Sequence, residues 1–456
     1  MKIIKKFLDL LSGSGSTPKG EDTTPEPVVV ARDGHAVSRR NIDADAMKVL
    51  SRLNRFDHTA YLVGGGVRDL LLRRKVKDFD VATSAHPNEV KKLFRNCRLV
   101  GRRFRLAHIL FRGGKVIEVS TFRRHAGFGD EGELLIKSDN TFGNAEEDAL
   151  RRDFTMNGLF YSIADSTVID YVGGLKDIEA KVVATIGKPG IRFREDPIRM
   201  LRALRFAARL DFTLAPATAR ALEKHRKEVW KAAVQRNLEE ILRMLQQGAA
   251  AESFRLMDET GLLKILLPRL AADYAAEETG DQIRRNLAAI DAMKIPDHRM
   301  TTGFLTAILY FPSFLAESRR ADASVDRLKM AVELLDKDLA KLQFPRLQIE
   351  RARQLLAAQH RIENIGKKKI RPSVLARKTY FDDALTIFEI TRPPSRENRA
   401  IVRRWRSLTP DAKADAPSGS DGERKGEEKK GGGSRRRSRS GSRRRRGPRK
   451  KPENPS

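Results

Sequence analysis

Residues 59–83 read TAYLVGGGVRDLLLRRKVKDFDVAT, and this stretch decides the fold of the first half of the chain. Residues 61–63 are apolar and predict a short buried strand, which three glycines follow at once. Beyond the glycines, apolar residues recur at helical spacing, so we expect a helix that begins on the glycine turn. Such a turn offers free backbone N–H groups to an anion, which makes Gly64 and Gly65 candidate phosphate-binding residues.

A second strand is predicted shortly after this helix, at residues 77–81. Side chains alternate along a strand, so Asp78 and Asp80 are expected on one face. Carboxylates beside phosphate oxygens are the ligands that Mg²⁺ prefers. The stretch therefore predicts a site for two Mg²⁺ ions in phosphoryl transfer, with Asp78 and Asp80 as the metal ligands.

Two further charged residues near this site have two interpretations each. Arg68, early in the helix, could hold a phosphate bidentately, or it could pair with Asp69 at the surface. Glu118 lies inside a predicted strand at residues 116–121 and is a candidate third carboxylate, or a surface strand position. The sequence leaves both alternatives open.

Composition limits the class of protein. The chain has 456 residues, enough for two or three domains, and a net charge of +30. Residues 411–456 carry +9 of this charge and the remaining residues carry +21, so we expect a polyanionic partner, most simply nucleic acid. Cys97 is the only cysteine, which excludes an intrachain disulfide and favours a reducing, cytoplasmic location. No apolar run approaches the length of a membrane span, so no membrane partner is expected.

The polar cluster that begins at Arg151 is a second candidate site. It contains Arg152, Asp153 and Asn157 within seven residues. An aspartate near a nucleotide could accept a hydrogen bond from a ribose 2′-hydroxyl group. Taken alone, the cluster is explained better by an ion pair at a helix terminus.

Asp196 and Arg199 form a third candidate site, at the start of an amphipathic helix. Asp196 is expected to be the N-cap, and Pro197 suits the first turn. At i, i+3 spacing Asp196 and Arg199 are neighbours, and one only accepts hydrogen bonds while the other only donates them. Adenine and cytosine present an amino donor beside a ring-nitrogen acceptor, and guanine and uracil present the reverse. The pair therefore matches A and C, although a helix cap with an i, i+3 ion pair is the simpler interpretation when it is taken alone.

In combination, these sites resemble those of a known family. The segments LVGGGVRDLLL with KDFDVAT, RRDFTMNGLFYS, DYVGGLKDI and REDPIRMLRALRFAARL are similar to the motifs of the class II nucleotidyltransferases, which comprise bacterial poly(A) polymerases and tRNA CCA-adding enzymes. The lead-in HAVSRRNIDADAMKVLSRLN, the stretch LFRNCRLVGRRFRLAH and the Arg-rich tail look more like the poly(A) polymerases. One departure is that residues 122–140 look shorter than the corresponding poly(A) polymerase loop, which bears on the selection of A over C.

The resemblance implies an α/β plus all-α fold with a polymerase-β-like nucleotidyltransferase head. The expected parts are an N-terminal extension or linker (1–41), a catalytic head (42–187), a neck (188–250), a helical body (251–408) and a disordered basic tail (409–456). By position, Asp78 and Asp80 would bind Mg²⁺, and Asp153 would be a third catalytic aspartate beside the ribose. Arg152 and Asn157 would support the nucleotide, and Asp196 and Arg199 would read its base.

The activity that follows from the resemblance is template-independent addition of AMP from ATP to RNA 3′ ends. ATP and RNA are thus the expected partners. A tRNA CCA-adding enzyme is the nearest alternative, because the Asp196/Arg199 pair reads A and C alike. A non-catalytic RNA-binding protein on a transferase scaffold is disfavoured by the intact Asp78, Asp80 and Asp153, and a small-molecule adenylyltransferase by the basic body and tail.

Overall fold

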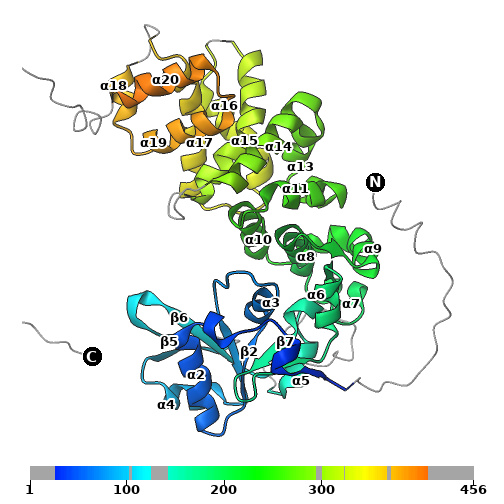
Figure 1. Ribbon diagram of the computed structural model, residues 1–456. Coiled ribbons are helices and arrows are strands. Elements are labelled where there is room, and N and C mark those ends of the chain that lie inside the picture. The colour runs from blue at the N-terminus through cyan, green and yellow to red at the C-terminus, as the bar shows by residue number, and fades with distance from the viewer. Residues whose placement is uncertain are drawn as a thin grey trace, which may run out of the picture. The chain divides into compact units, whose positions relative to one another are not determined.

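The structure is a computed structural model, and Figure 1 shows its course. It describes residues 26–101, 105–124, 142–293, 300–322, 324–366 and 371–408. Most of the loop expected at residues 122–140 and all of the expected basic tail lie outside these ranges.

One mixed sheet of eight strands organises the head, in the spatial order β1-β8-β7-β2-β3-β6-β5-β4. Only β3 and β6 pair in parallel; the other neighbours in this sheet are antiparallel. The strands are β1 (Val28–Val30), β2 (Ala60–Val63), β3 (Asp80–Thr83), β4 (Cys97–Val100), β5 (Leu106–Leu110), β6 (Val116–Thr121), β7 (Leu159–Ser162) and β8 (Val168–Asp170). The α/β head predicted from the sequence is confirmed.

Short helices accompany the sheet: α2 (Ala44–Arg55), α3 (Gly65–Leu71), α4 (Pro87–Leu93), α5 (Ala145–Leu150) and α6 (Gly174–Glu179). The side chain of Asp43 caps α2 by accepting hydrogen bonds from the backbone N–H groups of Asp45 and Ala46. Leu50 and Leu53 of α2 belong to the same buried cluster as Leu62 and Val81 of the sheet. This packing fixes the ends of β2 and β3, which carry the candidate site.

Two local predictions differ from the structure. β3 begins at Asp80 rather than at residue 77, so Asp78 lies just before the strand. The reason is that the ladder with β2 starts at the Val63–Asp80 pair, and the chain leaves β2 at Gly64 to enter α3, so Asp78 has no strand partner. The second difference is β1, which lies in the segment expected to be a linker and pairs with β8.

The second half of the described chain is helical, as predicted. The segment predicted to be the neck contains α7 (Pro189–Glu195), α8 (Ile198–Leu210), α9 (Pro216–His225) and α10 (Val234–Gln246). The body follows with α11 (Ala250–Glu259), α12 (Leu262–Leu266), α13 (Pro268–Ala275), α14 (Glu277–Ala292), α15 (Thr302–Arg320), α16 (Arg327–Leu339), α17 (Arg346–Glu363), α18 (Pro372–Ala376), α19 (Phe381–Thr391) and α20 (Arg396–Arg406). One continuous apolar core joins the neck to the body, from Phe193 to Trp405. In the ranges that the structure describes, no helix combines the length and apolarity of a membrane span.

Candidate active site

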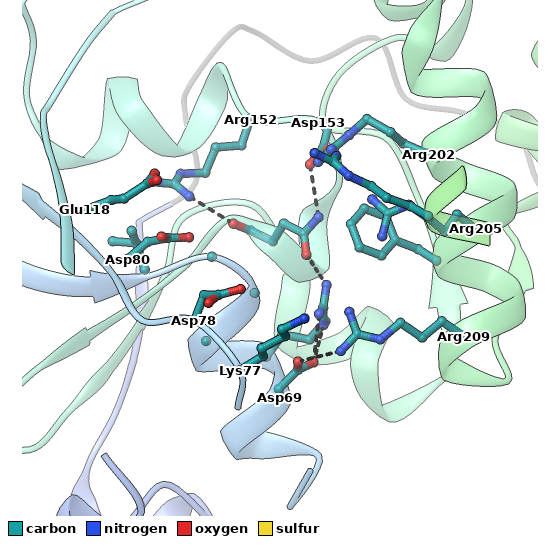
Figure 2. Close-up of a pocket in the computed structure, with 18 of the residues that line it drawn as sticks. Asp69, Lys77, Asp78, Asp80, Glu118, Arg152, Asp153, Arg202, Arg205 and Arg209 are labelled. Carbon is teal, nitrogen blue, oxygen red and sulfur yellow. Dashed lines mark hydrogen bonds and ion pairs between the residues drawn. The ribbon is translucent and has the colours of Figure 1, made fainter. Parts of the chain in front are cut away.

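A cleft of about 930 Å³ opens between the sheet of the head and the helices α8 and α10. All ten residues that the sequence singled out for catalysis or nucleotide binding line it: Gly64, Gly65, Arg68, Asp78, Asp80, Arg152, Asp153, Asn157, Asp196 and Arg199. Figure 2 shows Asp78, Asp80 and Glu118 on one side of the cleft, which we call the sheet wall. The facing side, the helix wall, is lined by arginines of α8 and α10 and by the acids Asp153 and Asp196. Buried Glu240 of α10 contacts Arg205 of this wall.

The glycine turn between β2 and α3 needs glycine at its first position. Gly64 has a φ of +69°, in the left-handed region that other residues rarely adopt. A Cβ atom at Gly64 would also lie 3.0 Å from Nη1 of Arg152. The turn and the first residues of α3 line the cleft, and their binding of phosphate stays a prediction.

The sheet wall carries three carboxylates. Asp80, at the start of β3, pairs in register with Glu118 of the parallel strand β6, and Asp78 lies two residues earlier. The pKa of Asp80 is raised to about 6 by its withdrawal from bulk water and by the negative charges of Glu118 and Asp78. The positive charge of Arg152 lowers this pKa in part. The Asp80 residue is nevertheless exposed in the open cleft, so water screens the repulsion and its energetic cost is small.

The oxygen donors of the sheet wall fit a divalent cation whose coordination shell the substrate completes. The carboxylates of Asp78 and Asp80 make no hydrogen bond or ion pair with any residue in the described ranges. Those ranges contain no group of three or more His, Cys, Asp or Glu side chains that could hold a metal ion alone. Mg²⁺ is commonly held by one or two carboxylates together with waters and substrate phosphates, and Asp78 and Asp80 are carboxylates of this kind.

Arg68 is committed to partners within the protein. Its Nε and Nη2 atoms donate to Oδ1 of Asp69 at 2.9 and 2.7 Å, and its Nη1 donates to Oδ1 of Asn157 at 2.6 Å. The guanidinium lies 5.1 Å from the centre of the Phe206 ring and is almost fully buried. The pair with Asp69 considered from the sequence therefore exists, but in the interior rather than at the surface. Asp69 also contacts Arg209 of α8 at 3.4 Å, which links the head to the neck.

Asp153 is the most strongly held acid of the cleft. It accepts hydrogen bonds from Asn157 at 3.1 Å, from the backbone N–H of Phe154 at 2.9 Å and from Nε and Nη2 of Arg202 at 2.8 and 2.6 Å. Burial alone would raise the pKa of Asp153, but the charge of Arg202 and these hydrogen bonds lower it to about 2. Asp153 is thus an ionised acceptor in a fixed orientation, rather than one half of an ion pair with a neighbour in its own helix.

Arg152 has a partner that sequence reasoning missed. Its Nε and Nη2 atoms donate to Oδ2 of the buried Asp148, and Arg151 donates to the other oxygen of the same carboxylate. The Arg152 guanidinium also lies 5.2 Å from the centre of the Phe160 ring. Asp148 sits three and four residues before the two arginines, a helical spacing that could have revealed the arrangement.

Asp196 and Arg199 both face the cleft but do not pair with each other. Arg199 donates from Nη1 to Oε2 of Glu195 at 3.0 Å and to the backbone oxygen of Arg192 at 2.9 Å. Asp196 is paired with Arg236 of α10 instead. The prediction that Asp196 caps α8 is wrong, because Pro197 occupies the capping position and Asp196 ends α7.

Helix α10 supplies residues that sequence reasoning did not assign. Arg236 and Arg243 of α10 line the cleft beside α8, together with Gln247, which directly follows the helix. Buried Glu240 accepts from Arg205 at 2.6 Å and from Arg243 at 2.8 Å, and it lies 3.7 Å from Arg202. The recurrence of these polar residues on one face of an amphipathic helix was the available signal.

Comparison with known proteins gives consistent matches. The Poly A polymerase head domain family matches residues 60–184, and the family described as "Probable RNA and SrmB- binding site of polymerase A" matches residues 211–274. Poly(A) polymerase I of Escherichia coli O6:H1 is 44% identical over 326 residues, which cover 68% of this chain and 69% of that protein. The CCA-adding enzyme of Lactobacillus gasseri is 39% identical over 219 residues, which cover 48% of this chain and 54% of that protein.

A solved structure agrees with the described fold. The crystal structure of the Bacillus stearothermophilus CCA-adding enzyme in complex with CTP matches with a TM-score of 0.58 and 28% sequence identity. The match covers 79% of this chain and 82% of that one. Both the head and the helical part that follows it therefore have counterparts of known structure.

Proposed function

The chain belongs to the poly(A) polymerase family of nucleotidyltransferases, and from this premise we propose that it adds AMP from ATP to RNA 3′ ends without a template. The observation that carries the proposal is that a single cleft contains Asp78 and Asp80 on one wall and Asp196 and Arg199 on the other. Poly(A) polymerase I relatives match a longer part of the chain than CCA-adding relatives do, which favours adenylate addition over CCA addition.

Asp78 and Asp80 are the residues that would hold the divalent cation, for which we propose Mg²⁺. When bound, such a cation offsets phosphate charge and makes a hydroxyl group easier to deprotonate. The convergence of Asp80 with Glu118 supports this proposal, because a cation between carboxylates relieves their repulsion.

The remaining cleft residues orient the nucleotide in this proposal. The glycine turn leaves room for the triphosphate, and Arg152, held by Asp148, places its Nη1 atom beside Gly64 of that turn. Asp153 is kept ionised by Arg202 and would accept a hydrogen bond from a ribose hydroxyl group. With the sugar and phosphates held, the RNA 3′-hydroxyl oxygen attacks the α-phosphorus, a new phosphodiester bond forms and pyrophosphate leaves.

Asp196 and Arg199 are proposed to read the base edge. The two side chains line the cleft as an acceptor and a donor fixed by different partners. Adenine offers an amino donor to the first and a ring-nitrogen acceptor to the second, whereas guanine and uracil set acceptor against Asp196 and donor against Arg199. The arrangement accepts cytosine as well, so the nucleotide edge alone does not separate the two activities of the wider family.

The decisive experiment supplies one labelled nucleotide at a time to the purified protein. The substrates are an unstructured RNA and a tRNA that lacks its terminal CCA. We expect many ATP-dependent additions to the unstructured RNA with no defined stop, and poor use of GTP and UTP. A product that needs CTP first and halts at CCA on the tRNA would contradict the proposal and establish CCA addition instead.

Two further features of the protein are proposed from its charge and its cysteine. We propose that the reaction serves RNA processing or decay, because the chain carries +21 net charge outside its basic tail and suits RNA as a partner. We propose a cytoplasmic location, since Cys97 is a free, buried thiol.

A further inference from the structure

The two side chains proposed to read the base are held in different ways. Arg199 is buried and fixed by Glu195 and by the backbone oxygen of Arg192, both within its own part of the neck. The Asp196 carboxylate is fixed from another helix, because Nη1 and Nη2 of Arg236 donate to Oδ1 and Oδ2 at 2.8 and 2.9 Å. The acceptor of the pair thus depends on α10, 40 residues further along the chain.

No other described side chain hydrogen-bonds the Asp196 carboxylate. Asp196 lies between α7 and α8, in an extended backbone conformation with a φ of −144°. The start of α8 has no side-chain capping hydrogen bond. Its side chain is 23% exposed, and without Arg236 water would be its principal partner. A carboxylate in that situation rotates among several orientations, and only some of them present an oxygen to a base in the cleft.

The bidentate geometry leaves Asp196 able to bind a second donor. Each carboxylate oxygen has two lone pairs, and Arg236 uses one on each oxygen. One acceptor site per oxygen therefore remains, in a plane that the planar guanidinium sets. An amino group of a base can donate to such a site, whereas a carbonyl oxygen of a base is repelled by it.

We propose that Arg236 is a specificity-determining residue, which aligns the Asp196 carboxylate so that the cleft favours adenine over guanine and uracil. The inference rests on the proposed function, since it concerns the same nucleotide site. Arg236 acts through Asp196 and is a positioning residue. A lysine could neutralise the carboxylate but could not fix its plane, because an ammonium group has no planar fork.

The test measures kcat/KM for ATP, CTP, GTP and UTP with the full-length protein and an unstructured RNA. We expect Arg236→Ala to lower kcat/KM for ATP roughly tenfold, which is the effect of losing about one hydrogen bond to a charged group. The kcat/KM values for GTP and UTP should change little. The ATP-to-GTP preference therefore shrinks by about the same factor, and Arg236→Lys gives an intermediate preference. The matched control is Arg353→Ala, which removes an Arg–Asp pair of 2.6 Å with Asp336 in the body and should leave all four values unchanged.

A double-mutant comparison separates positioning from a general structural role. If Arg236 acts through Asp196, then adding Arg236→Ala to Asp196→Ala changes the ATP-to-GTP preference no further. A parallel fall for all four nucleotides together with a lower Tm would overturn the inference, and so would an unchanged preference in Arg236→Ala.

Failure of the proposed function gives a different result. A wild-type protein that adds CCA to tRNA and does not extend the unstructured RNA would refute poly(A) addition. The Arg236 inference would then be decided on the tRNA, because A and C share the base edge that Asp196 reads. An unchanged preference for CTP and ATP over GTP in Arg236→Ala would overturn it there.

Discussion

The acids on the two walls of the cleft have opposite electrostatic surroundings. On the sheet wall, Asp80 faces Glu118, and its pKa is raised to about 6 by withdrawal from water and by neighbouring carboxylates. On the helix wall, Asp153 is paired with Arg202, and its pKa is lowered to about 2 despite burial. Asp196 and Glu240 are likewise paired with arginines. Asp78 and Asp80 therefore have no ion-pair partner among the described residues, whereas Asp153, Asp196 and Glu240 each have an arginine partner.

This difference separates two tasks. Acids with arginine partners are fixed in orientation, so they suit recognition by hydrogen bonds. Acids that repel one another gain most from a ligand that carries positive charge. The comparison predicts that substitutions on the sheet wall abolish chemistry, whereas substitutions on the helix wall alter stability and selectivity.

The largest effect is expected from the sheet wall. Asp78→Ala or Asp80→Ala should reduce turnover with ATP and Mg²⁺ at least a thousandfold, because removal of a metal ligand costs roughly 4 kcal/mol of transition-state stabilisation. The fold should persist, since neither carboxylate has a hydrogen-bond partner in the described part of the protein. Glu179→Ala, at an exposed acid of the head, is the matched control. Near-normal turnover in either aspartate variant would refute the metal assignment.

The next largest effect is expected from the C-terminal residues 435–456, whose removal should leave both walls of the cleft unchanged. Residues 435–456 contain 11 Lys/Arg and one acid, so they are expected to increase the affinity for RNA without regard to its sequence. If about five of these cations contact phosphates, truncation after Ser434 should flatten the slope of log affinity against log salt by roughly 3.5 units for single-stranded RNA. Turnover at saturating RNA should be retained, because chemistry belongs to the cleft. A salt slope equal to that of the full chain would leave the tail without this role.

On the helix wall, Arg202→Ala is expected to lower the free energy of unfolding by roughly 2 kcal/mol at pH 7, because it leaves the Asp153 carboxylate without its charged hydrogen-bond partner. A depressed carboxyl pKa contributes stability above the unfolded value near 4, and this contribution is lost as pH falls toward 2. The difference in the free energy of unfolding between the wild-type protein and Arg202→Ala, measured in urea, should therefore shrink as pH falls from about 4 toward 2. Adding Asp153→Asn should recover part of the loss by removing the unpaired charge, and no recovery would argue against the pair.

The sheet wall was more predictable from sequence than the helix wall, for a physical reason. The strand, glycine turn and helix of residues 60–71 are encoded locally, by apolar spacing and by the conformational freedom of Gly64. Even there, the position of Asp78 was missed, because it depends on where the β2 ladder ends. The helix wall depends on contacts between distant residues, such as the pair of Asp196 with Arg236, which no local pattern reports.

The smallest effect tests whether repulsion on the sheet wall is real. A carboxyl whose pKa is raised in the folded state binds its proton more tightly there than in the unfolded chain, so the protein loses stability as pH rises from about 4 through 6. Asp80→Asn escapes this loss. Because Asp80 is exposed, water screens the effect, and we expect Tm to rise by only about 1–2 °C at pH 7.5, with no difference from wild type at pH 3.5.

The same variant distinguishes repulsion from a simple packing change. Mg²⁺ should raise the Tm of the wild-type protein at pH 7.5 more than that of Asp80→Asn, because the cation relieves a repulsion that the variant lacks. Glu179→Gln, an exposed head acid outside the cleft lining, should show neither the pH-dependent nor the Mg²⁺-dependent difference. A gain in Tm for Asp80→Asn that is equal at both pH values would show that the charge of Asp80 is not the cause. The contrast between the two walls would then rest on the arginine pairs of Asp153, Asp196 and Glu240 alone.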